Sequence, residues 1–132
     1  QLGLEVVRRR YGASYLDLLL HEPGSAYRRG QVTVQPGLAV HLAILAPVAV
    51  YGPAETTTFE RGGGATILGP DDLYRLPPGE GWPAHEQALR STLEDAGYTF
   101  LSSARMRRVV DVDVPLRTPP HTVFDALFYY VS

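Results

Sequence analysis

The chain has 132 residues, a formal net charge of −2, 45% hydrophobic residues and no cysteine. This length predicts one globular domain, residues 1–132, that buries about two-thirds of the surface exposed by its unfolded chain. The composition excludes disulfides and cysteine-based sites, gives no general attraction to nucleic acid, and contains no apolar run near the ~18 residues of a membrane helix.

All 12 basic residues are arginine, and the chain contains neither lysine nor asparagine. The absence of lysine excludes Schiff-base chemistry and the phosphate-binding lysine of a P-loop. Codon bias in a GC-rich genome explains this absence together with the abundant glycine, proline, alanine and arginine, so we expect a bacterial protein. The start of the chain carries no signal-peptide pattern, and we expect a cytoplasmic location.

The first 22 residues contain two predicted elements. Leu4, Val7 and Tyr11 fall at helical spacing and predict a helix near Leu2–Tyr11 that packs on a sheet. After Gly12 the leucines alternate with other residues, which predicts a strand over residues 14–22.

The segment Leu38–Tyr51 alternates almost without a break. One parity holds large apolar residues, and the other holds small residues together with His41 and Tyr51. Because successive side chains of a strand point to opposite faces, the segment predicts the central strand, or a bent strand pair, of a sheet covered on both sides. Pro47 predicts a bend or an edge position. Further strands are predicted at 31–35, 56–60 and 65–68, with a turn at Pro36-Gly37.

One helix is clear at Pro83–Ala96, with proline in its first turn and Gly97 just after its end. Valines that alternate with aspartates predict a strand within residues 106–114. The tail fits either an apolar edge strand or a helical turn over residues 122–128, and we favour the turn. Together these elements predict an α+β fold: a mostly antiparallel sheet of about five or six strands, with the helix Pro83–Ala96 and the N-terminal helix packed on it.

Five residues are candidates for ligand binding. His41 lies on the small face of the central segment beside Tyr51, and His85 opens the helix. Asp111 and Asp113 project from one strand face roughly 6.5–7 Å apart, a spacing that suits a divalent cation or acid–base chemistry. A hydrogen-bonded core histidine and a solvated strand face are the more common explanations of these patterns. No third ligand lies close to the aspartates, so the sequence predicts no metal site, cofactor or catalytic residue.

The leading functional hypothesis is a non-enzymatic domain that acts through protein contact, as a homodimer. Phe128, Tyr129 and Tyr130 are the interface candidates, because aromatic rings bury a large area. The alternative is a small-molecule-binding domain or hydrolase in which His41 or His85 meets the two aspartates. A second alternative is a weak nucleic-acid binder that uses the arginines of residues 8–10, 28–29 and 107–108. Nearby acidic residues offset these arginines and argue against a nucleic-acid partner.

Overall fold

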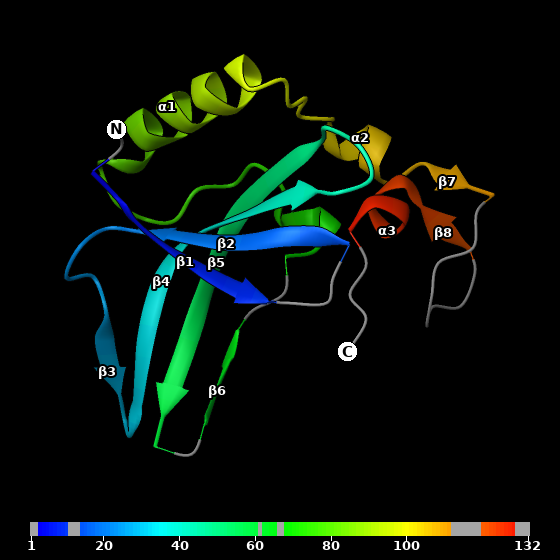
Figure 1. Cartoon of the computed structure of the whole chain (residues 1–132). Helices are drawn as coiled ribbons and strands as arrows, with labels where there is room; N and C mark the ends of the chain where they lie inside the picture. Colours follow the sequence, from blue (N-terminus) through cyan, green and yellow to red (C-terminus); the bar gives the residue numbers. More distant parts are fainter. Residues whose placement is uncertain (1–2, 11–13, 61, 66–67, 112–119, 129–132) are drawn as a thin grey trace.

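The computed structural model of the chain describes residues 3–10, 14–60, 62–65, 68–111 and 120–128. The fold is α+β, as predicted: a curled antiparallel sheet carries one 14-residue helix and a few short helical turns (Figure 1). No helix among the described residues has the length and apolar character needed to cross a membrane. The elements are β1 (Glu5–Arg10), β2 (Tyr15–His21), β3 (Tyr27–Arg29), β4 (Val32–Ala43), β5 (Ala49–Phe59), β6 (Gly62–Ala65), η1 (Pro70–Asp72), α1 (Trp82–Asp95), α2 (Ser103–Met106), β7 (Val109–Val110), β8 (His121–Thr122) and α3 (Val123–Leu127).

The main sheet has the strand order β1-β2-β4-β5-β6, and β3 also pairs with β4. The long strands β4 and β5 run through two regions. In the body, β4 pairs with β2 under α1. Below it, the other halves of β4 and β5 pair with β3 and β6 and extend away from the body (Figure 1). We call this extension, residues 27–35 and 55–60 with β6, the arm.

The predicted N-terminal helix is wrong. Residues 5–10 form strand β1, which pairs antiparallel with β2 and places Val6 opposite Leu20. The adjacent β-branched residues Val6 and Val7 favour a strand, and pairing with β2 overrides the weak helical spacing. Leu4 still contributes to the core, where it packs against the cluster under α1.

The segment Leu38–Tyr51 is the bent strand pair, with its bend at residues 44–48. The bend changes the side-chain parity. His41 pairs with Val50, whereas Val40 pairs with Tyr51, so His41 and Tyr51 point to opposite faces of the sheet.

The predicted turn at Pro36-Gly37 is wrong, because β4 continues through both residues. Glycine is needed there: a Cβ on Gly37 would lie 2.3 Å from the carbonyl oxygen of Leu20. The predicted strands at 31–35 and 56–60 are parts of β4 and β5, except for the end residues Gln31 and Glu60. In the predicted strand at 65–68, Ala65 belongs to β6, Leu68 lies outside any strand, and residues 66–67 lie outside the described residues.

The predicted helix Pro83–Ala96 is confirmed within one residue at each end as α1. Gly97 follows it with a φ of +97°, a conformation that favours glycine. The helical turn predicted over residues 122–128 is also confirmed, as α3, whose capping box joins Thr122 and Asp125. Within the predicted strand 106–114, Met106 ends the short helix α2 and only β7 is extended; residues 112–114 lie outside the described residues.

Two apolar clusters hold the sheet, one on each face. Under α1, Trp82 and Leu89 pack on Leu20, Leu38 and Val40. The other cluster joins the sheet to η1, α2 and α3, and includes Tyr15, Ala43, Val50, Leu68, Leu73, Met106, Phe124 and Phe128. The sheet is therefore covered on both sides, as the alternation of residues 38–51 predicts.

Gly52 offers a test of how closely η1 packs on β5. A Cβ at this position would lie 2.4 Å from the carbonyl oxygen of Asp72 and 2.5 Å from Leu68 Cδ1. We expect Gly52→Ala to lower the free energy of unfolding by roughly 1–3 kcal/mol, because the backbone has to move. Urea unfolding measures the loss. In the arm, Gly64→Ala is the control, since its nearest contact is an ordinary 3.5 Å to Thr57 Oγ1; equal losses in both variants would contradict the prediction.

Candidate functional site

The most buried polar cluster joins β1, β2 and β4 on the face opposite α1. Asp17 Oδ1 accepts a hydrogen bond from Arg9 Nε at 3.1 Å and lies 3.3 Å from His41 Nε2. The side chains of all three residues are at most 1% exposed. The pairing register explains this arrangement, because Asp17 stands directly opposite His41 on adjacent strands.

The charges in this cluster compensate one another. Burial raises the pKa of Asp17, but the hydrogen bond and charge of His41 and the charge of Arg9 outweigh it, so that pKa lies below its ordinary value of 3.8. The Tyr15 ring stacks on His41 with 4.3 Å between centroids, and Phe128 contacts both rings, at 6.1 Å from His41 and 5.8 Å from Tyr15. The cluster is thus an enclosed ion-pair network, with no surface opening at His41.

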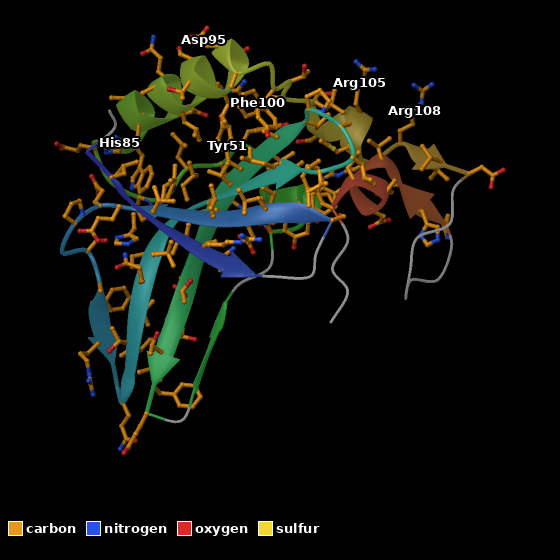
Figure 2. The ribbon with its side chains drawn as sticks, viewed as in Figure 1. Tyr51, His85, Asp95, Phe100, Arg105 and Arg108 are labelled. Carbon is orange, nitrogen blue, oxygen red and sulfur yellow. The ribbon has the colours of Figure 1, made fainter. Side chains whose placement is uncertain are left out.

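The second polar cluster lies between the sheet and α1. The Tyr51 hydroxyl donates to Glu86 and accepts from Arg90 Nε at 2.7 Å. The Arg90 guanidinium also lies 4.8–5.4 Å from the ring centroids of Phe100, Tyr74 and Tyr51. Figure 2 shows Tyr51 and Phe100 in the layer beneath α1. These contacts fix α1 to the sheet by a charged hydrogen-bond pair and by cation–π attraction.

Burial raises the pKa of both tyrosines in this cluster. Burial and the Glu86 carboxylate raise the pKa of Tyr51 far above its ordinary value of 10, and Arg90 opposes part of this rise. Burial also raises the pKa of Tyr74 to about 12. The Tyr74 hydroxyl donates to the carbonyl of Leu101. Both phenols therefore stay neutral at physiological pH and act as hydrogen-bond donors.

His85 lies at the start of α1, where it is only partly exposed. Its Nε2 atom is 3.5 Å from Glu22 Oε2, and its ring meets Trp82 edge-on. Figure 2 places His85 at the end of α1 away from α2. The pair ties the first turn of α1 to the segment after β2.

The predicted site residues do not form one site. His41 lies in the cluster opposite α1, while Tyr51 and His85 lie on the α1 side. The two histidines pair with Asp17 and Glu22 rather than with Asp111, which is exposed at the end of β7. Asp113 lies outside the described residues.

The predicted interface residues do not form an exposed cluster within the part of the chain that the structure describes. The described part of the chain contains no group of three His, Asp or Glu residues that could hold a metal ion. Phe128, predicted at an interface, is 3% exposed and packs on Tyr15. Tyr129 and Tyr130 lie outside the described residues.

Three of the arginines in the sequence runs have acidic partners. Arg9 binds the buried Asp17, Arg29 binds Glu55 at 3.2 Å, and Arg107 binds Asp71. These pairs reduce the positive charge that the runs offer to a phosphate backbone.

Two hollows lie on opposite faces of the arm. An apolar groove of about 440 Å³ opens where the arm joins the body. A polar hollow of about 850 Å³ opens further along the arm. Both volumes fall within the range of ligand sites. The groove is lined by Tyr27, Pro36, Gly37, Pro53, Ala54, Glu55, Pro77 and Pro78, and the polar hollow by Arg28, Gln31, Thr33, Thr58, Phe59 and Glu60.

Large apolar side chains are also exposed at three places on the body, one of which is Val109 of β7 at 64%. On β1, Val6 is 56% exposed and Val7 is 44% exposed. In the turn between β4 and β5, Ile44 is 70% and Leu45 is 64% exposed. Exposed apolar residues that lie together are typical of contact surfaces.

No family model, no curated protein and no solved structure matches this chain. The candidate sites are the two buried clusters, the two hollows and the exposed apolar residues. The buried clusters hold the fold together, and the open surfaces are available to a partner or ligand.

Sequence reasoning missed Asp17, Arg90 and the arm. A signal for Asp17 was present, because an aspartate inside an apolar alternation requires a buried partner. Glu86 and Arg90 stand four residues apart on one helix face, which is also a readable signal. The hollows carried no such signal, since they depend on the pairing of β3, β4 and β5.

Asp17 predicts a stability that depends on pH. Because its pKa is lower in the folded state, its contribution is present above the unfolded pKa of 3.8 and is lost as pH falls through the folded pKa. We expect Asp17→Asn to lower the free energy of unfolding by roughly 3–5 kcal/mol near neutral pH, because it breaks a buried charge pair.

Chemical unfolding of both proteins from neutral pH to about pH 3 measures this difference. The difference in free energy of unfolding between wild type and variant should narrow as the pH falls. A difference that stays constant would show that the Asp17 charge does not contribute to stability.

The raised pKa of Tyr51 predicts a stability that is lost in alkali rather than in acid. Because its pKa is raised on folding, its contribution is complete below the unfolded value of about 10 and is lost as pH rises above it. We expect Tyr51→Phe to cost roughly 1.5–3 kcal/mol near neutral pH, since the hydroxyl bonds two charged groups. The variant should also lose less stability than wild type in alkaline solution. Tyr74→Phe is the control, because that hydroxyl bonds only a backbone carbonyl and its variant should lose less.

Proposed function

We propose that the chain is a non-enzymatic domain that acts through protein contact, and that a second copy of the chain is its partner. The observation that carries the proposal is the edge strand β1. Among the described strands, β1 pairs with β2 alone, so its outer edge offers backbone donors and acceptors to another strand. Such an edge is a template for pairing with another chain.

The side chains of β1 support pairing at this edge. Val6 and Val7 point to opposite faces of the sheet, and each is about half exposed. A second β1 strand alongside would cover part of both valines. The gain is the removal of apolar surface from water, worth roughly 25 cal/mol for each Å².

The charges of β1 favour an antiparallel pair. The strand begins at Glu5 and carries Arg8 toward its other end, while Arg9 is paired with the buried Asp17. In a parallel pair the Arg8 residues of both copies would lie together, whereas in an antiparallel pair Glu5 of one copy lies toward Arg8 of the other. Antiparallel pairing is also the arrangement that a two-fold symmetric dimer gives.

The chemistry of the buried clusters supports a binding role over a catalytic one. His41 and Asp17 are enclosed, and Tyr51 is 0% exposed, so these groups serve the core. The composition adds two companion proposals. The chain lacks lysine and asparagine, which supports a bacterial source with a GC-rich genome. It also lacks the cysteines that staple many secreted small domains, which supports a cytoplasmic location.

Sedimentation velocity over a wide range of protein concentrations tests the proposal. We expect wild type to change from monomer to dimer as its concentration rises. Val7→Lys should shift this transition to higher concentration by at least roughly tenfold, because it places a charge at the pairing edge.

Leu45→Lys is the matched control, because Leu45 is also an exposed aliphatic residue but lies in the turn between β4 and β5. The Leu45→Lys variant should dimerise over the same concentration range as wild type. A monomer at every concentration would overturn the proposal, and an equal effect of both substitutions would place the interface elsewhere.

A further inference from the structure

A β-bulge in β1 sets the direction of the Arg9 side chain. The register between β1 and β2 shifts between Arg8 and Arg10, so Arg9 is an additional residue of β1. Such a bulge re-aims a side chain, and bulges recur beside functional sites. The Arg9 side chain turns into the protein, where it is 1% exposed and its Nε atom donates to Asp17 Oδ1 at 3.1 Å.

Only part of the hydrogen-bonding capacity of this buried guanidinium is used. The terminal nitrogens Nη1 and Nη2 of Arg9 are enclosed as well, and neither has a hydrogen-bond partner among the residues that the structure describes. A guanidinium carries N–H donors on all three of its nitrogens. Because buried donors on a charged group are costly to leave unpaired, the two Nη groups require an acceptor that the described residues do not supply.

Arg90 shows the other way in which this fold stabilises a guanidinium. Its Nε atom donates to the Tyr51 hydroxyl, and three aromatic rings lie 4.8–5.4 Å from its guanidinium carbon. No ring in the described part of the chain lies over Arg9 in this way. Cation–π attraction therefore does not compensate for the unpaired donors of Arg9.

The missing partner has to be a hydrogen-bond acceptor that fits an enclosed position. A guanidinium only donates, so cations and pure donors are excluded. Charge decides between the remaining acceptors, because unlike charges attract more strongly in a low-dielectric interior and a water molecule has no net charge. Arg9 and His41 also lie against the same carboxylate of Asp17, so the cluster can accept a second anion when His41 is protonated. Enclosure limits that anion to a small one.

We propose that the two Nη groups of Arg9 bind a small monovalent anion of the size of chloride or formate. Both ions accept hydrogen bonds from the two terminal nitrogens at once, chloride as a sphere and formate through its two oxygens. The ion completes the hydrogen bonding of Arg9, and the stability of the folded chain then depends on the concentration of the anion. The inference does not rest on the proposed dimer, because the site lies within one copy of the chain.

The test follows thermal unfolding of the whole chain while sodium gluconate is replaced by sodium chloride or sodium formate at constant ionic strength. Gluconate is too large for an enclosed site, so the general screening by salt stays constant. We expect about 200 mM chloride or formate to raise the Tm by roughly 3–5 °C, as saturable binding with a dissociation constant on the order of 20 mM gives. Formamide has nearly the size and shape of formate but no charge, and it should leave the Tm unchanged.

Arg9→Lys is the informative variant, because it keeps a positive charge beside Asp17 but removes the two Nη groups. We expect its Tm to lose the dependence on chloride and formate. Arg29→Lys is the matched control, since Arg29 also binds a carboxylate, at 3.2 Å from Glu55, but has a side chain that is 60% exposed. The control variant should keep the full rise in Tm.

Chloride NMR adds a measurement that requires only wild type: bound chloride broadens the signal, and formate should reverse the broadening by competition. Three outcomes of the unfolding experiment would overturn the proposal: neither ion raises the Tm, formamide raises it as much as formate, or Arg9→Lys keeps the dependence. If Arg9→Lys does not fold, the absence of broadening that formate reverses overturns it instead. None of these outcomes affects the dimer proposal, since that proposal is read from sedimentation.

Discussion

The pairing of β4 with β5 is the constraint on which the rest of the structure depends. The two strands keep one register over ten consecutive positions, from Leu42 opposite Ala49 to Thr33 opposite Thr58. In the body this register gives each face of the sheet its own set of side chains: Tyr51 with the layer under α1, and His41 with the layer against α3. A slip of one residue would exchange those sets and bury the wrong groups on both sides. The fold is therefore specified by polar residues as well as by apolar ones.

Each face of the body contains one charged cluster, and the two differ in how their charges are compensated. Opposite α1, the carboxylate of Asp17 lies between the Arg9 guanidinium and the His41 imidazole inside apolar walls, so removing Asp17 or Arg9 leaves a buried charge. Beneath α1, Arg90 is held by the hydroxyl of Tyr51 and by three ring faces, and Glu86 accepts from the same hydroxyl. The first cluster fixes the β1–β2–β4 register, and the second fixes the position of α1. Protonation of Asp17 in acid should therefore weaken the face opposite α1, and deprotonation of Tyr51 in alkali should weaken the face beneath α1.

The sequence was sufficient for the parts of this fold that depend on local pattern. The alternation of residues 38–51 and the capped helix gave the α+β class and the position of α1, and the helical spacing of the apolar tail residues gave the position of α3. It was insufficient where a distant strand decides the outcome. Leu4 and Val7 have helical spacing, but pairing with β2 makes residues 5–10 a strand. The partner of His41 could not be predicted for the same reason, because Asp17 lies beside it only through the β2–β4 register. The bend at residues 44–48 places His41 and Tyr51 on opposite faces of the sheet.

The division between body and arm explains where a large ligand can be recognised. The body covers both faces of the sheet, and the buried carboxylate of Asp17 is committed to internal pairs. The described part of the arm has less cover: Val34 is fully buried, but the two faces carry hollows, and polar side chains such as Arg28, Thr58 and Glu60 lie at the surface. The arm remains ordered because β4 and β5 are continuous with the body, and the rigid part of the fold therefore positions the part that is open to solvent.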